Sequence, residues 1–160
     1  MKSRIIILST LAVIATVVLS ACSAINPVGK VAKDAYDIPY TVLDNYFVRN
    51  DVDVSKQQKL ILTNQADFDS FFGMAATMGY NGTPTDVNFK TQYVVAIILP
   101  ETDRSTTVTP TRVRQNGNAI IVDYKVTKGD RNSYTLVPFG AVVLDKPATD
   151  QQMEVYFNQQ

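Results

Sequence analysis

The run of residues 93–99 (YVVAIIL) constrains the fold more than any other stretch of this chain. Side chains of a strand alternate between two faces, and this run is apolar at both parities. A strand with two apolar faces has to be covered on both of them, which places it in the centre of a sheet. The sequence therefore predicts a β-rich core built around residues 93–99.

A hairpin is indicated at residues 115–118 (QNGN). Asn-Gly supplies the two positive φ angles of a two-residue type I′ turn, and with that turn Val113 faces Ile120. The alternation of the second strand then points one set of side chains inward, namely Ile120, Val122, Tyr124 and Val126. It points the other set outward, namely Asp123, Lys125 and Thr127.

Further strands are predicted at residues 45–49, 59–63, 134–144 and 153–157, and a turn at residues 128–132 (KGDRN). Pro110 has no amide proton to donate to a neighbouring strand. It therefore indicates an edge position or a β-bulge in the strand that precedes the hairpin.

One helix is predicted at about residues 65–78. Its apolar stripe follows the i, i+3, i+4, i+7, i+8 spacing and consists of Phe68, Phe71, Phe72, Ala75 and Ala76. Asn64 is placed to cap its first turn, and Gly79 to end it. The fold class is therefore α+β, with a mostly antiparallel, sandwich-like sheet and one packed helix in a single domain at residues 41–160.

The first 21 residues carry the pattern of a secretory signal: Lys2 and Arg4 precede an apolar run at residues 5–19, and small residues follow. Residues 19–22 (LSAC) resemble the lipobox of bacterial lipoproteins. That resemblance implies that residues 1–21 are removed and that Cys22 carries diacylglycerol and, on its amino group, a further acyl chain such as palmitate. Cys22 is the only cysteine of the chain.

Two acyl chains hold a protein on a membrane without spanning it, because each buried methylene contributes about 0.8 kcal/mol. Ser23 after the lipidated position suggests the outer membrane under the enterobacterial sorting rule. Two alternatives stay open: residues 5–21 remain as an uncleaved anchor, or Cys22 is incidental and cleavage follows Ala24. Residues 22–40, with prolines, a glycine and scattered charge, are expected to be a tether.

Nucleic acid is not an expected partner. The 15 cations equal the 15 anions, and removal of Lys2 and Arg4 leaves an excess of two anions. Binding to nucleic acid needs a basic face that displaces counterions.

The residue types argue against catalysis and against metal sites. The chain has no histidine, which excludes Ser-His-Asp and Cys-His catalysis and the usual zinc sites. Residues 51–55 (DVDVS) resemble the start of a calcium loop, but Lys56 and Leu62 stand where such a loop needs Gly and Glu. The carboxylate pairs Asp67/Asp69 and Asp51/Asp53 are not placed to share a substrate. We expect a non-enzyme without metal or cofactor.

What remains is the surface, where Tyr and Arg side chains on exposed turns are the candidate contacts. These are Tyr80 in the loop of residues 79–88, Arg104 in residues 102–107, and Arg131 and Tyr134 in residues 128–134. Tyr and Arg are enriched among the residues that dominate binding energy at protein interfaces.

The order of a doubly apolar strand (93–99), an NG hairpin (118–126) and a Pro-containing strand (138–145) is similar to the C-terminal domain of the PrcB family. Those are bacterial lipoproteins named as protease-complex subunits. In place of the family's Gly-Gly-Tyr segment, this chain has residues 100–105 (PETDRS), so a contact through that segment is not carried over. The domain also resembles small Bacteroidetes lipoproteins of unknown role.

The expected function is that of a lipid-anchored lipoprotein of the bacterial cell envelope, with a non-catalytic domain that binds a protein. The resemblance implies a protease-complex subunit or inhibitor, with two orientations of the domain left open, toward the periplasm or toward the outside. The alternative is a small-ligand or glycan-binding module, for which Tyr80 and Tyr134 are the candidate residues.

Overall fold

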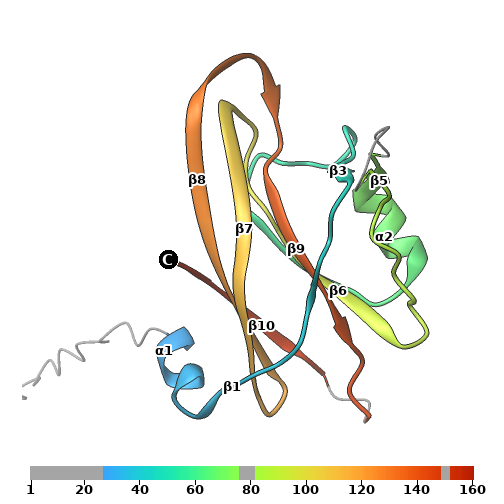
Figure 1. Cartoon of the computed structure of the whole chain (residues 1–160), viewed down its shortest axis with the longest axis vertical. Helices are drawn as coiled ribbons and strands as arrows, with labels where there is room; N and C mark the ends of the chain where they lie inside the picture. Colours follow the sequence, from blue (N-terminus) through green and yellow to red (C-terminus); the bar gives the residue numbers. More distant parts are fainter. Residues whose placement is uncertain (1–26, 76–81, 149–151) are drawn as a thin grey trace, which may run out of the picture.

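The computed structural model describes residues 27–75, 82–148 and 152–160. In chain order the elements are α1 (Pro27–Val31), a 3-10 turn η1 (Ala32–Asp34), β1 (Tyr36–Asp37), β2 (Thr41–Val42), β3 (Tyr46–Val48), β4 (Gln58–Leu62), α2 (Gln65–Phe71), β5 (Phe72–Met74), β6 (Gln92–Ile98), β7 (Thr102–Asn116), β8 (Ala119–Leu136), β9 (Phe139–Asp145) and β10 (Glu154–Gln159). The fold is α+β and sandwich-like, as the sequence predicts (Figure 1).

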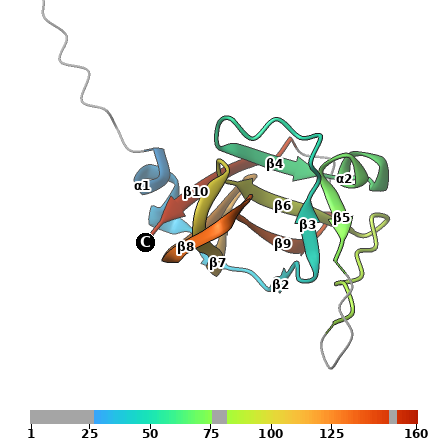
Figure 2. The ribbon, with the colours of Figure 1, turned by 90° about the horizontal axis from the view of Figure 1, so that it is seen from above.

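Three layers are stacked in the domain. The first sheet has the order β1-β7-β8-β10 and the second the order β2-β9-β6-β4; a small β3–β5 ribbon with α2 forms the third layer (Figure 2). One apolar cluster fills the space between the two sheets, and a second lies between the second sheet and the third layer. The second sheet is therefore buried on both faces.

β6 is the central strand that residues 93–99 predict. It pairs with β4 on one side and β9 on the other, and Tyr93 to Ile98 are all buried. Tyr93, Val95 and Ile97 belong to the cluster between the sheets, whereas Val94 and Ile98 belong to the other one. Burial of the Tyr93 ring raises the pKa of its hydroxyl to about 12.

The hairpin forms where the sequence predicts it, but one residue further along. Its loop is Gly117-Asn118, and Asn116 pairs with Ala119. Only the first loop residue, Gly117, has a positive φ (58°), which is the φ pattern of a type II′ turn and not of type I′. Side-chain hydrogen bonds fix this register: the Asn116 amide donates to the Val31 carbonyl, and the Asn118 amide to the Gln152 carbonyl.

Between the turn and the bulge that follows it, the shift moves each pairing by two residues, so Val113 faces Val122 and not Ile120. Because this shift is even, the side chains of that stretch keep their predicted faces. Ile120, Val122 and Tyr124 lie in the core, and Val126 packs against it. The predicted bulge is also present, between Pro110 and Arg112.

The two sheets approach closely where β9 passes β7. A Cβ atom added to Gly140 would lie 2.7 Å from Val108 Cγ1 and 3.1 Å from the Val108 carbonyl oxygen. A larger residue would force the strands apart, so glycine at position 140 sets this contact.

Helix α2 begins as predicted and ends early. The Asn64 side chain accepts a hydrogen bond from the Asp67 amide at the N-cap. The helix ends at Phe71 and not near 78, because Phe72, Gly73 and Met74 pair with β3 as strand β5. Phe68 and Phe72 are still buried in one cluster, and their rings lie 5.3 Å apart. Gly79, the predicted C-cap, lies outside the described residues.

The expected tether at residues 22–40 is structured from Pro27 onward. We call residues 27–38 the strap: it comprises α1, η1 and β1, and it ends with the Ile38 amide donating to the Val113 carbonyl at 3.0 Å. β1 pairs with β7, and α1 and η1 contact β10 and β7. Because β1 pairs with the edge of β7 and Ile38 packs against the core, this segment belongs to the domain.

The predicted strand at residues 153–157 is present as β10, and it pairs with β8 in parallel. The first sheet is therefore mixed, and the other strand pairings of the two sheets are antiparallel. Phe157 from β10 closes the core against Tyr124, with ring centroids 6.2 Å apart.

Candidate functional site

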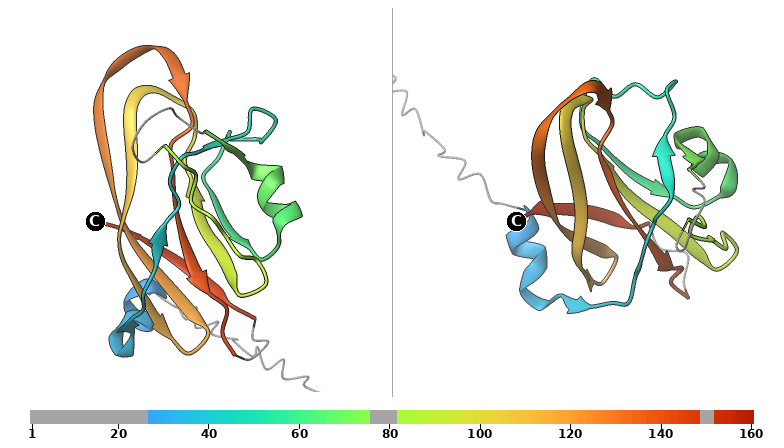
Figure 3. Two further views of the ribbon diagram at one scale, coloured as in Figure 1. Left: turned by 45° about the vertical axis from the view of Figure 1, so that its right-hand side comes forward. Right: turned by 45° about the horizontal axis from the view of Figure 1, so that its top comes forward.

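β7 and β8 extend beyond the rest of the domain as a two-stranded ribbon (Figures 1 and 3). We define the distal ribbon as residues 102–107 of β7 and 125–136 of β8. No residue of these two segments is buried, and most are exposed. Of these residues, Val126 alone packs against the core cluster between the sheets. In a small domain, a ribbon that projects into solvent and contributes so little to the core is a candidate contact surface.

Three of the four predicted contact residues lie on the distal ribbon. Arg104 and Arg131 are directly opposite each other in register, and Tyr134 is 64% exposed. Arg131 Nε lies 3.2 Å from Asp103 Oδ2, and Arg104 Nη1 donates to the Gly129 carbonyl at 3.4 Å. The fourth residue, Tyr80, lies outside the described residues.

The expectation that residues 102–107 and 128–134 form turns is wrong, because both are strand. Between Thr106 and Thr102, β8 advances eight residues, from Lys128 to Leu136, while β7 advances four. The extra residues are accommodated as bulges, for which Gly129 is suited because it has no side chain. The turn-forming composition of residues 128–132 therefore bends a strand and does not end it.

The free edge of the distal ribbon is protected against further strand pairing. Along this edge β10 reaches only to Tyr124, and beyond that point β7 is the only strand paired with β8 in the described part of the chain. Bulges and the exposed Lys125, Lys128 and Arg131 disfavour addition of another strand. Binding at this ribbon therefore relies on side chains.

The distal ribbon carries a positive charge in a domain without net positive charge. Its cations are Arg104, Lys125, Lys128 and Arg131, and its anions are Asp103 and Asp130. One buried donor, Asn132 Nδ2, has no hydrogen-bond partner among the described residues. The base of the ribbon is held by a hydrogen bond from the Thr135 hydroxyl to the Glu101 carboxylate.

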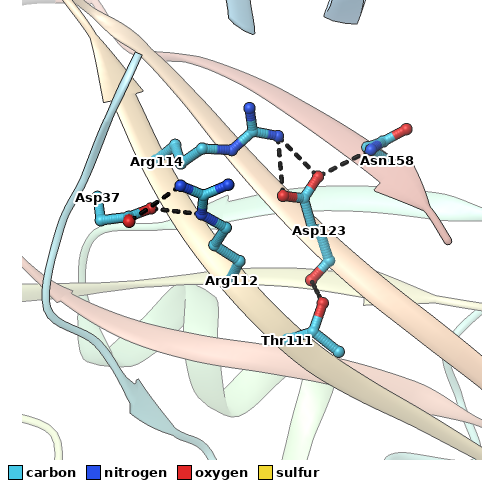
Figure 4. Close-up of polar contacts among 6 residues, drawn as sticks. All are labelled: Asp37, Thr111, Arg112, Arg114, Asp123 and Asn158. Atoms are coloured by element: carbon cyan, nitrogen blue, oxygen red, sulfur yellow. Dashed lines mark hydrogen bonds and ion pairs between the residues drawn. The ribbon is translucent and has the colours of Figure 1, made fainter.

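A second polar cluster crosses the outer face of the first sheet (Figure 4). The Asp123 carboxylate accepts hydrogen bonds from Arg114 Nη2 at 2.9 and 2.8 Å and from Asn158 Nδ2 at 2.8 Å. Asp123 is 1% exposed. This buried ion pair ties β7, β8 and β10 together. Asp123 lies on the outer face, as the alternation of residues 120–127 predicts, but it is not exposed there, because Arg114 and Asn158 cover it.

The neighbouring ion pair joins the strap to the same sheet. Arg112 donates through Nε and Nη2 to the two oxygens of Asp37, at 2.6 and 3.0 Å (Figure 4). The hydrogen bond from Arg112 lowers the pKa of the Asp37 carboxyl, and the same contact raises the pKa of Arg112. The bidentate geometry matches the guanidinium fork to the carboxylate.

The carboxylates considered for acid/base chemistry each have a local partner. Asp67 accepts from the Asn64 amide group at 2.7 Å, and Asp69 from Gln65 at 2.7 Å. Asp51 pairs with Arg49, and Asp53 accepts from the Ser55 amide. In the described residues no group of three or more His, Cys, Asp or Glu side chains is placed to hold a metal ion.

The helices of the described segments are all too short or too polar to cross a membrane. Comparison with protein-family models, with curated proteins and with solved structures gave no match to this chain.

Proposed function

We propose that this protein is a lipid-anchored lipoprotein of the bacterial cell envelope whose domain binds a protein partner through the distal ribbon, without catalysis. The observation that carries the proposal is that Arg104, Arg131 and Tyr134 are all exposed on the same projecting ribbon, where Arg104 and Arg131 are paired in register. Rigid strands present these side chains at a fixed spacing, which lowers the entropy lost on binding.

The charge of the distal ribbon indicates the chemistry of the partner. The ribbon has four cations and two anions, and this excess of positive charge favours an acidic protein surface as the partner. Such a surface would also be attracted from a distance. Tyr134 can supply apolar contact area with a hydroxyl at its end. The PrcB-like strand order suggests a protease or membrane complex of the envelope as the class of partner.

The short connection to the proposed anchor supports an orientation of the domain in which the distal ribbon points away from the membrane. Only four residues separate Cys22 from Pro27, where α1 begins. At about 3.5 Å per residue, they hold the α1 end of the domain within roughly 18 Å of the lipid. α1 lies at the opposite end of the long axis from the distal ribbon (Figure 1), so the ribbon faces away from the proposed outer-membrane anchor.

The test is a crosslinked pull-down of the tagged, full-length protein from cell envelopes, with partners identified by mass spectrometry. We expect one dominant protein, depleted at least tenfold by the triple substitution Arg104→Ala, Arg131→Ala and Tyr134→Ala. The matched control is Lys59→Ala, Lys90→Ala and Tyr36→Ala, which removes two exposed cations and one exposed tyrosine elsewhere. A partner retained equally by both variants would exclude the distal ribbon as its binding surface.

A further inference from the structure

The β3–β5 ribbon has one face that is open to solvent and carries an aromatic ring. Tyr46, Val48 and Phe72 pack on the core side, whereas Phe47 lies on the other face and is 46% exposed. The ring of Phe47 stands over Gly73, its partner in register. Its position is therefore set by the ribbon and not by the core.

Glycine at position 73 is explained by this ring. A Cβ atom there would lie 2.5 Å from Cζ and 2.8 Å from Cε1 of Phe47. Gly73 has no positive φ, so the backbone alone does not demand glycine. Any larger residue would displace the ring; with glycine, the ring rests on the backbone and keeps much of its surface exposed.

Polar groups surround the ring at one end of β3. An open depression of about 430 Å³ is lined by Phe47, Arg49, Asn50 and Asp51. Arg49 Nε lies 3.1 Å from Asp51 Oδ1, and this hydrogen bond lowers the pKa of Asp51. The site therefore offers a carboxylate, a guanidinium and an amide next to an aromatic ring, and its two charges cancel.

A second open depression, of about 570 Å³, lies at the other end of β3. It is lined by Asp44, Asn45, Thr83 and Thr85. Its walls are tied together, since Asn45 Nδ2 donates to the Thr83 carbonyl at 2.9 Å and the Asp44 amide donates to Thr85 Oγ1 at 2.9 Å. The aromatic ring thus lies between two polar hollows along a stretch of about 13 Å from Asn45 to Arg49, at 3.3 Å per residue.

We propose that this face of the β3–β5 ribbon is a binding site for an uncharged oligosaccharide. The C–H face of a pyranose ring stacks on Phe47, and its hydroxyl groups bond to Asn50 and to the Arg49–Asp51 pair. In the depression beside Phe47, an anionic or cationic ligand gains nothing from a pair whose charges cancel, and a single apolar ring among polar groups is too small for an apolar peptide. In the other hollow, the Asp44 carboxylate can accept hydrogen bonds from sugar hydroxyl groups. The site does not depend on the protein partner proposed above.

The test is calorimetric titration of the detergent-solubilised, full-length protein with three hexasaccharides: maltohexaose, cellohexaose and chitohexaose. We expect saturable binding of at least one, with Kd of about 1 mM. Phe47→Ala is expected to raise Kd at least tenfold, and Phe47→Tyr to preserve it. The control is Met74→Ala, which removes a more exposed apolar side chain from the same ribbon, outside the depression.

Two milder variants cover the case in which Phe47→Ala unfolds, as judged by circular dichroism. Gly73→Ala displaces the ring without removing it, and Asn50→Ala removes one polar contact; each is expected to weaken binding at least threefold. The proposal is overturned if none of the three sugars binds, if Met74→Ala weakens binding as much as Phe47→Ala, or if the Phe47 and Gly73 variants bind as well as the wild type.

Discussion

The carboxylate of Asp123 is buried on the outer face of the first sheet and is held there by Arg114 and Asn158. A charge removed from water is tolerated only when a partner and hydrogen bonds compensate for its lost hydration. Arg114, with a side chain only 12% exposed, depends on Asp123 in the same way. Each residue of this pair therefore makes the burial of the other tolerable.

Replacing Asp123 by alanine should destabilise the domain by about 3–5 kcal/mol, because Arg114 would remain buried without its counter-charge. Chemical denaturation with urea measures this as a lower midpoint. The control Asp103→Ala breaks the exposed pair with Arg131 and should change the midpoint far less, because water screens that pair. Similar losses in the two variants would contradict the role assigned to the buried pair.

At the scale of elements, the strap is held to the sheet by the pairing of β1 with β7 and by further contacts. These include the Asp37–Arg112 ion pair, the hydrogen bond from Ile38 to Val113 and the contact of Asn116 with Val31. The pKa of Asp37 is lowered in the folded state, so this ion pair stabilises docking above the ordinary carboxyl pKa of about 3.9 and loses its effect as pH falls below it.

We expect Asp37→Asn to speed hydrogen exchange of the Ile38 amide at neutral pH, because the bidentate ion pair no longer holds β1 on β7. Exchange in β6 should not change, since that strand is buried elsewhere in the fold. Acidification of the wild type below about pH 4 should weaken strap docking in the same direction, whereas the variant should show little further change. Unaltered protection at Ile38 would mean that backbone pairing alone holds the strap.

At the scale of the whole molecule, the two ends of the long axis carry different features. The strap and the β7–β8 turn lie at one end of the long axis, and the distal ribbon at the other (Figure 3). An anchor at Cys22 would hold the first end near the membrane and present the second to other proteins. The proposed function depends on this polarity as much as on any single residue.

The lipid itself can be tested in cells fed with alkyne-palmitate. We expect label on the wild-type protein and none on Cys22→Ala, because the thiol that would carry the diacylglycerol is absent. Ser23→Ala is the control and should be labelled normally. Label that persists in Cys22→Ala, or a wild-type protein without label, would contradict lipidation at this residue.

Rules that act between neighbouring residues were sufficient to predict three features of the fold. The central strand follows from an apolar run with two buried faces, the start of α2 from the Asn64 cap, and the bulge from a proline without an amide proton. The hairpin was found by its Asn-Gly signal, while its turn type and register depend on side-chain contacts of Asn116 and Asn118 with distant segments.

The sequence by itself determined the fold class, the central strand and the faces of residues 120–127 on β8, because alternation and turn chemistry act between near neighbours. Only the tertiary structure decided where α2 ends, that residues 27–38 pack on the sheet, and that Asp123 is buried. It also brought Arg104 and Arg131 together and placed Phe47 over Gly73. Each of these depends on pairing between distant segments, whose free energy no local pattern contains.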